Sequence, residues 1–293
     1  MPEPAPIDPA GAEAGMPRRE QRAGRNLPVA IATALLLAGL LVATLLLSRP
    51  AFVLFLVGIV TLALLELLTV LRARATRPAR AVVLAVGVLL VAGAYLEGPA
   101  ALSFGLLVTI LAAFGWYLVD RGRTEVTRNV AATVFATVYV PFMAAHLALV
   151  VGRADHYVGA LLGYAALVVI YDTAAYGTGA TLGRRPIAPQ ISPNKTWEGA
   201  VGGTVTCLLA GAFLLPLWEP WTIASGLVLA AATCVVAPLG DLSESMLKRD
   251  LAVKDMGSIL PGHGGVLDRV DALLFMAPVL YYVLAAFDVI RSP

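Results

Sequence analysis

Charged side chains and thiols are scarce in this sequence. Only 14% of its 293 residues are Asp, Glu, Lys or Arg, whereas a soluble domain usually has about 25%. Its two cysteines, Cys207 and Cys234, lack the C-x-x-C and Cys/His spacings of zinc sites and redox motifs. These shortages exclude a disulfide scaffold and argue against a soluble domain, a zinc site and a catalytic thiol.

Apolar residues dominate instead. The residues Ala, Val, Ile, Leu, Met, Phe, Trp, Tyr and Cys make up 59% of the chain, and the chain also has 27 glycines. In soluble domains, apolar residues and glycine together make up only about 45–50%. The apolar residues form long uniform runs without the alternation of strands, and about 20 of them suffice for a helix to cross a bilayer. We predict an all-α, polytopic membrane protein with nine transmembrane helices. The predicted helices are 27–47, 51–70, 81–96, 100–119, 130–150, 158–176, 199–216, 221–240 and 272–287.

The positions of Lys and Arg predict the orientation. With the N-terminus in the cytoplasm, 18 of the 21 basic residues fall in cytoplasmic segments, and three fall outside: Arg49, Arg153 and Arg291. Positive charge favours the cytoplasmic side of a membrane. We therefore predict a multi-pass protein of the cell membrane with a cytoplasmic N-terminus and an extracytoplasmic C-terminus.

The chain is predicted to have three parts. Residues 1–26 are rich in Pro, Ala, Gly and charge and are expected to be a disordered cytoplasmic tail. N-terminal transmembrane helices follow at 27–157, and C-terminal ones at 158–293. The last part contains two long polar loops on the predicted cytoplasmic side, 177–198 and 241–271.

The second loop concentrates acids and bases. If the eighth helix continues past its span, Asp241, Glu244 and Lys248 share one face, and so do Asp268 and Asp271 at the start of the ninth. Carboxylates from two helix ends beside lysines and arginines are what a magnesium–polyphosphate site requires. The glycines near residue 264 would let backbone N–H groups approach an anion. The pattern therefore predicts a phosphate-binding site at the cytoplasmic face.

Two motifs carry a family resemblance. From Ser245 to Asp271 the chain reads S-x2-K-R-x4-K-D-x-G-x2-L-P-G-H-G-G-x2-D-R-x-D, and from Ser192 to Gly199 it reads S-P-N-K-T-W-E-G. Both resemble the signatures of the phosphatidate cytidylyltransferase (CDP-diacylglycerol synthase) family. The resemblance implies a magnesium-dependent nucleotidyltransferase of phospholipid synthesis. Its reaction joins CTP and phosphatidic acid, giving CDP-diacylglycerol and pyrophosphate at the cytoplasmic face.

The resemblance also implies roles for particular residues. Magnesium is expected at Asp241 and Asp268, with Asp172, Glu244 and Asp271 as further candidates and room for a second cation. The implied catalytic residues are Asp241, Lys248, Arg249, Lys254, Asp255, His263, Asp268, Arg269 and Asp271. The implied substrate-binding residues are Asp172, Ser192, Lys195, Thr196, Glu198, Ser245, Gly264 and Gly265. The expected partners are CTP, phosphatidic acid, the bilayer and a second copy of the chain in a homodimer, with no nucleic acid.

Several residues have two interpretations. Ser192 and Pro193 fit the N-cap and first position of the seventh helix, which would direct free N–H groups at an anion. Trp197 either stacks a cytosine or, as we favour, anchors the membrane interface. Glu66 is a functional intramembrane acid or extends to the cytoplasmic interface. His146 is expected to hydrogen-bond between helices rather than to act in catalysis.

Other functions fit parts of the pattern. An ion-coupled transporter would also have many helices and buried acids, but the charges here gather in loops and not at the midplane. A CTP-dependent enzyme acting on an isoprenoid lipid or a polyprenol would share the nucleotide half of the site. A family member without activity is disfavoured by the intact string of acids and bases.

Overall fold

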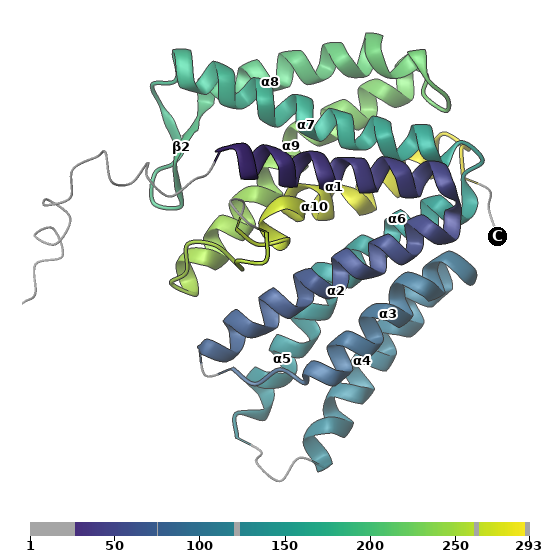
Figure 1. Cartoon of the computed structure of the whole chain (residues 1–293), viewed down its shortest axis with the longest axis vertical. Helices are drawn as coiled ribbons and strands as arrows, with labels where there is room; N and C mark the ends of the chain where they lie inside the picture. Colours follow the sequence, from purple (N-terminus) through teal and green to yellow (C-terminus); the bar gives the residue numbers. More distant parts are fainter. Residues whose placement is uncertain (1–26, 75, 120–123, 261–263, 291–293) are drawn as a thin grey trace, which may run out of the picture.

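Long helices make up nearly all of the computed structural model, which describes residues 27–74, 76–119, 124–260 and 264–290 (Figure 1). The predicted tail, residues 1–26, lies outside the described residues. The α-helices are α1 (Leu27–Leu47), α2 (Arg49–Ala73), α3 (Arg80–Leu96), α4 (Pro99–Val119), α5 (Val126–Thr137), α6 (Met143–Arg153), α7 (Tyr157–Leu182), α8 (Trp197–Leu209), α9 (Ile223–Asp250) and α10 (Leu267–Ala286). The described residues also form three short helical turns: η2 (Val138–Phe142), η3 (Ala210–Leu214) and η4 (Leu215–Leu217).

Each of the nine predicted runs falls on a helix. Within the described residues, seven helices are long and apolar enough to cross a membrane, and two shorter apolar helices are Ala32–Leu47 and Arg80–Leu96. One of the seven, Val126–Arg153, is a continuous helix. It contains the π-helical turn η2, which we attribute to Pro141, because proline lacks the N–H that a regular α-helical turn would use. The protein is therefore an all-α polytopic membrane protein. The count of nine spans, the orientation and the division at residue 157 stay predictions.

One short β hairpin interrupts the helices. Strand β1 (Pro186–Ala188) pairs antiparallel with β2 (Ser192–Thr196), so Ser192 and Pro193 do not begin a helix as predicted. Pairing with β1 keeps this backbone extended up to Thr196. The side chain of Thr196 then caps α8 by accepting a hydrogen bond of 3.2 Å from Gly199 N. The helix begins four residues later than the N1 position that we assigned to Pro193.

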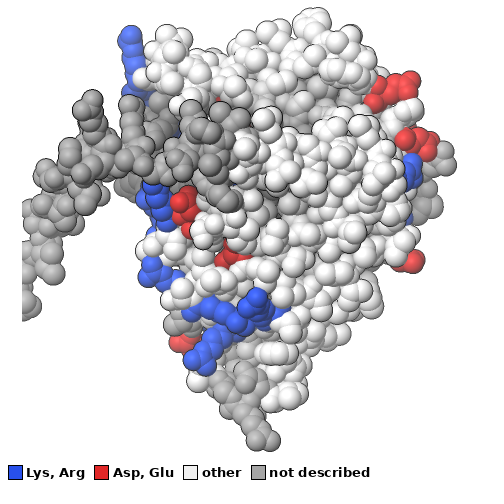
Figure 2. Space-filling view, viewed as in Figure 1, with Lys and Arg blue, Asp and Glu red and all other residues white. Residues whose placement is uncertain are grey.

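Small residues allow the C-terminal helices to pack closely. A Cβ atom on Gly203 of α8 would lie 2.9 Å from Ala175 Cβ of α7, so these two helices approach with no room for a larger side chain. Helices α9 and α10 also pack against each other. The hairpin, the end of α9 and the start of α10 lie at the left side of Figure 1. Many of the visible Lys and Arg side chains gather on the same side of the surface (Figure 2).

Candidate functional site

A polar cavity of about 940 Å³ lies where α7, the hairpin, α8, α9 and α10 meet. It brings the two motif segments to one place. Ten of the predicted site residues line it: Asp172, Ser192, Lys195, Thr196, Asp241, Lys248, Asp255, Asp268, Arg269 and Asp271. Glu244 lines it as well. Three lining residues with polar side chains were not among the predicted site residues: Tyr171, Tyr176 and Asn194, whose residue types carry no distinctive signal in an apolar helix or a loop.

The first ion pair in the cavity joins the hairpin to α9. Lys195 Nζ lies 2.5 Å from Asp241 Oδ2, and the two side chains are 25% and 37% exposed. One turn along α9, the Ser245 hydroxyl donates to Asp241 Oδ1 over 3.4 Å. This places a partly solvated cation and anion in the wall of the cavity.

The side chains of the second group of charges are almost inaccessible to solvent. Lys248 Nζ donates to Glu244 Oε2 over 2.6 Å and to Asp268 Oδ1 over 2.9 Å. The carboxylates are 1% and 3% exposed, and the lysine is 17% exposed. Glu244 and Lys248 stand one turn apart because α9 stays helical to Asp250, as the spacing predicted. Lys248 therefore neutralises acids from two helices at once.

One acid in this group has an unused oxygen. Glu244 Oε1 is buried and accepts no hydrogen bond from the donors that the structure describes. Its neighbour is the carboxyl group of Asp271, and two carboxyl groups this close repel each other whenever both are ionised. The negative charges of Asp172 and Asp241 also act on each other across the cavity. Such a surplus of negative charge fits a bound cation.

The fit to magnesium rests on this donor set. Among the described residues, no three His, Cys, Asp or Glu side chains form a ready-made metal site. Magnesium does not require one, since it is usually held by one or two carboxylates together with substrate phosphates and water. Asp268 is the less available donor, because its oxygens already accept from Lys248, Met256 N and Gly265 N. The contacts favour Asp241, Glu244 and Asp271, and the pairing of Asp241 with Asp268 on one ion stays a prediction.

Other predicted residues support the walls. Arg249 Nε donates to Ile191 O over 3.4 Å and joins the end of α9 to the hairpin. Glu198 Oε2 accepts from the backbone N–H groups of Arg184 and Arg185, which fixes the approach to β1. In the loop before α10, Gly264 has a φ of +79°, a conformation that favours glycine.

Two further residues with predicted roles lie away from the cavity wall, and a third lies outside the described residues. Lys254 is exposed and does not line the cavity. His263 lies outside the described residues. Trp197 is 58% exposed and does not line the cavity, as cytosine stacking there would require, and its role as an interfacial anchor stays a prediction.

Two polar residues of the apolar helices, Glu66 and His146, are both buried. Glu66 is 4% exposed, and its carboxylate binds the backbone at the start of α10 instead of reaching solvent. The described hydrogen bond of His146 runs to Phe142 O of its own helical segment, so the predicted hydrogen bond between helices is wrong. Its ring contacts Tyr281 and Tyr282 of α10 instead.

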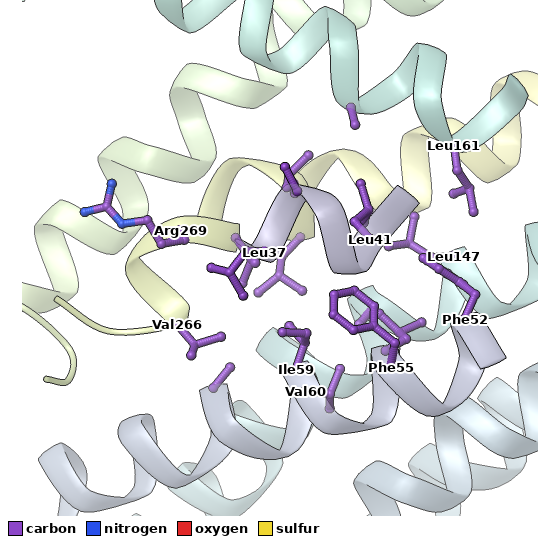
Figure 3. A pocket seen from close by; sticks show the side chains of 18 of the residues that line it. Leu37, Leu41, Phe52, Phe55, Ile59, Val60, Leu147, Leu161, Val266 and Arg269 are labelled. Atoms are coloured by element: carbon purple, nitrogen blue, oxygen red, sulfur yellow. The ribbon is translucent and has the colours of Figure 1, made fainter. Parts of the chain in front are cut away.

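An apolar cavity of about 230 Å³ adjoins the polar one, and Arg269 lines both. Its walls come mainly from α1, α2, α6, α7 and α10. Figure 3 shows Arg269 and Val266 at one end of this cavity and Phe52 and Leu161 at the other. An arginine thus stands between a charged compartment and one made of hydrocarbon side chains.

The fold and the two cavities define a polytopic membrane protein in which a cavity lined by clustered acids and bases lies beside an apolar cavity. Sequence comparison then gives its family. The model of the cytidylyltransferase family matches residues 28–287, and the chain belongs to that family.

Named relatives agree. The phosphatidate cytidylyltransferase of Mycobacterium leprae is 35% identical over 288 residues, which cover 90% of this chain and 89% of that protein. Proteins of the same name from Bacillus subtilis and Haemophilus influenzae are 44% and 37% identical, each over 155 residues. Those two matches cover 52% and 49% of this chain, and 57% and 53% of the respective relatives.

Proposed function

We propose that this protein transfers the cytidylyl group of CTP to phosphatidic acid. An oxygen of the lipid phosphate attacks the α-phosphorus of CTP and forms a new P–O–P linkage. The bond from that phosphorus to the oxygen of the β-phosphate breaks, and pyrophosphate leaves. The observation that carries the proposal is the position of Arg269 between a polar cavity with fixed acids and bases and an apolar cavity.

The chain's own residues supply binding and charge. Lys195 and Lys248 are point charges for phosphate oxygens, whereas Arg269 offers a planar fork that matches a phosphate with two hydrogen bonds. Little covalent participation by the protein is needed, because in-line positioning and charge stabilisation account for most catalysis of phosphoryl-type transfer. Magnesium, held by carboxylates of Asp241, Glu244 and Asp271, would neutralise charge on the departing pyrophosphate.

The placement of the site follows from the charge distribution. We propose that the polar cavity faces the cytoplasm, where CTP is available, since the predicted cytoplasmic segments hold most of the basic residues. A second cation beside magnesium and a homodimer are further parts of the proposal. Neither is needed for the geometry described above.

A direct assay tests the function. Purified protein in detergent micelles receives labelled CTP, magnesium and either phosphatidic acid or a polyprenyl phosphate. We expect release of pyrophosphate and a labelled CDP-lipid with phosphatidic acid only, loss of both on chelation, and recovery with added magnesium. Product with the polyprenyl phosphate alone would favour the isoprenoid alternative, and no product with either lipid would refute the proposal.

The apolar cavity is proposed to hold part of an acyl chain. Val60→Phe places a larger side chain in its wall, whereas Leu54→Phe makes a similar change on the same helix at a side chain that is 73% exposed. Displacing two methylene groups costs about 1.6 kcal/mol, which corresponds to roughly tenfold. We expect Val60→Phe to raise KM for phosphatidic acid about tenfold and to leave KM for CTP unchanged. Equal values for the two variants would place the lipid chain elsewhere.

A further inference from the structure

Glu66 of α2 binds the start of α10, although 201 positions separate it from Leu267. Its Oε1 accepts from Val266 N over 3.0 Å, and its Oε2 accepts from Leu267 N over 2.9 Å. The first N–H groups of a helix have no acceptor within the helix, and a negative charge at this end is stabilising. The side chain of Val266, at the N-cap position, makes no capping hydrogen bond. Glu66 therefore caps α10 from a different helix.

The capped turn carries two residues of the polar cavity, Asp268 and Arg269. Asp268 Oδ2 accepts from Gly265 N over 2.8 Å and from Met256 N over 2.9 Å. Glu66 and Asp268 together accept hydrogen bonds from four backbone N–H groups of the loop and the start of α10. Without the Glu66 carboxylate, the turn that carries Asp268 would lose two of these four hydrogen bonds.

Helix α2 holds the other end of the same loop. Arg74, directly after α2, donates from Nε to Leu251 O over 2.7 Å and from Nη2 to Ala252 O over 3.2 Å. The segment between α9 and α10 is therefore fastened to α2 at both ends. Helix α2 does not line the polar cavity, so Glu66 and Arg74 can act on that site through this segment.

Two glycines make room for the Glu66 carboxylate. A Cβ atom on Gly257 would lie 2.3 Å from Glu66 Oε1, and one on Gly265 would lie 2.6 Å from Oε2. No side chain fits at either position without displacing the carboxylate. These two glycines of the long motif are thus explained by a contact with a residue far outside it.

We propose that Glu66 is a positioning residue for the polar cavity: it holds the start of α10 so that Asp268 and Arg269 face the substrate phosphates. What the cavity binds rests on the proposed function, whereas the bracing of the loop does not. Glu66 does not line the polar cavity and acts through the backbone of Val266 and Leu267.

Kinetics of a graded pair of variants test the proposal. Glu66→Ala removes both acceptors, whereas Glu66→Gln keeps one and turns an NH2 group toward the other backbone N–H. We expect kcat per folded molecule to fall about 10–100-fold in Glu66→Ala and less in Glu66→Gln, with KM for CTP changed much less than kcat. Leu67→Ala is the matched control, since Leu67 is the fully buried neighbour on α2. It should lower thermal stability and keep kcat per folded molecule. Wild-type kcat in Glu66→Ala, or an equal loss in Leu67→Ala, would overturn the proposal.

Hydrogen exchange provides a measurement that is independent of activity. We expect the amides of Met256, Gly265, Val266 and Leu267 to exchange faster in Glu66→Ala than in wild type and Leu67→Ala. Unchanged exchange would refute the role of Glu66 even if the protein makes CDP-lipid. Faster exchange in a protein that does not use CTP would support the bracing of the loop and refute only the proposed function.

Discussion

Lys248 compensates two acids that have almost no access to water. Removing one partner of a buried ion pair leaves the other charge unpaired and typically costs about 3–5 kcal/mol. A variant at Lys248 would therefore lose stability as well as any role with phosphate. Asp241 is 37% exposed, so its substitution separates chemistry from folding more cleanly.

Asp241→Asn should reduce turnover strongly while the protein remains folded. The change removes the charge that faces Lys195 and a proposed donor to magnesium. Changing a residue that only orients a metal ligand costs about 10–100-fold, so we expect at least that loss for a direct donor. Asp250→Asn is the matched control on the same helix, since Asp250 is exposed and does not line the cavity. Turnover measured with saturating CTP at a fixed amount of folded protein decides the outcome. Full activity in Asp241→Asn would remove this residue from the site.

At the scale of elements, close contacts between helices depend on glycine. Gly211 of η3 approaches α9 so closely that a Cβ atom would lie 2.5 Å from both Gly226 O and Ala230 Cβ. Gly115 of α4, by contrast, has no atom of another element within 4 Å of such a position. The same substitution therefore has opposite expected effects in two helices.

Gly211→Ala should destabilise the protein, whereas Gly115→Ala should not. Overpacking a close contact costs about 1–3 kcal/mol, and Ala replacing Gly within an unobstructed helix gains about 0.5–1 kcal/mol. We expect the midpoint of thermal unfolding in detergent to fall for the first variant and to stay equal or rise for the second. Equal midpoints for Gly211→Ala and wild type would mean that α9 and η3 can separate without cost.

At the scale of the whole molecule, the polar cavity and the hairpin lie at one end of the helices. The turn between α3 and α4, which contains Glu97, is predicted on the opposite side of the membrane. The basic residues predict that the hairpin end is cytoplasmic. The face from which CTP enters depends on this orientation.

Labelling of single cysteines tests the orientation in a background with Cys207 and Cys234 replaced. Gln190→Cys lies in the turn of the hairpin and Glu97→Cys in the opposite turn, and both positions are exposed. We expect a membrane-impermeant maleimide to label Glu97→Cys in intact cells and Gln190→Cys only after permeabilisation. The reverse pattern would place the polar cavity outside the cell.

Much of the site follows from local pattern. The predicted helical continuation of α9 puts Asp241, Glu244 and Lys248 on one face, and the structure confirms that α9 is helical to Asp250. The hairpin was missed because two short strands of polar residues give no periodic apolar signal. The contact of Glu66 with α10 was not predicted, because an isolated acid in an apolar run does not reveal what it binds.

The sequence by itself determined the apolar helices and the membrane class, because each helix satisfies its own backbone hydrogen bonds and its span depends only on the residues within it. Only the tertiary structure decided which charges meet. Lys248 and Asp268 are 20 positions apart, and Glu66 and Val266 are 200 apart. Such contacts depend on which helix faces pack together, and that choice is made by the shapes of many side chains at once and not by any local run of residues.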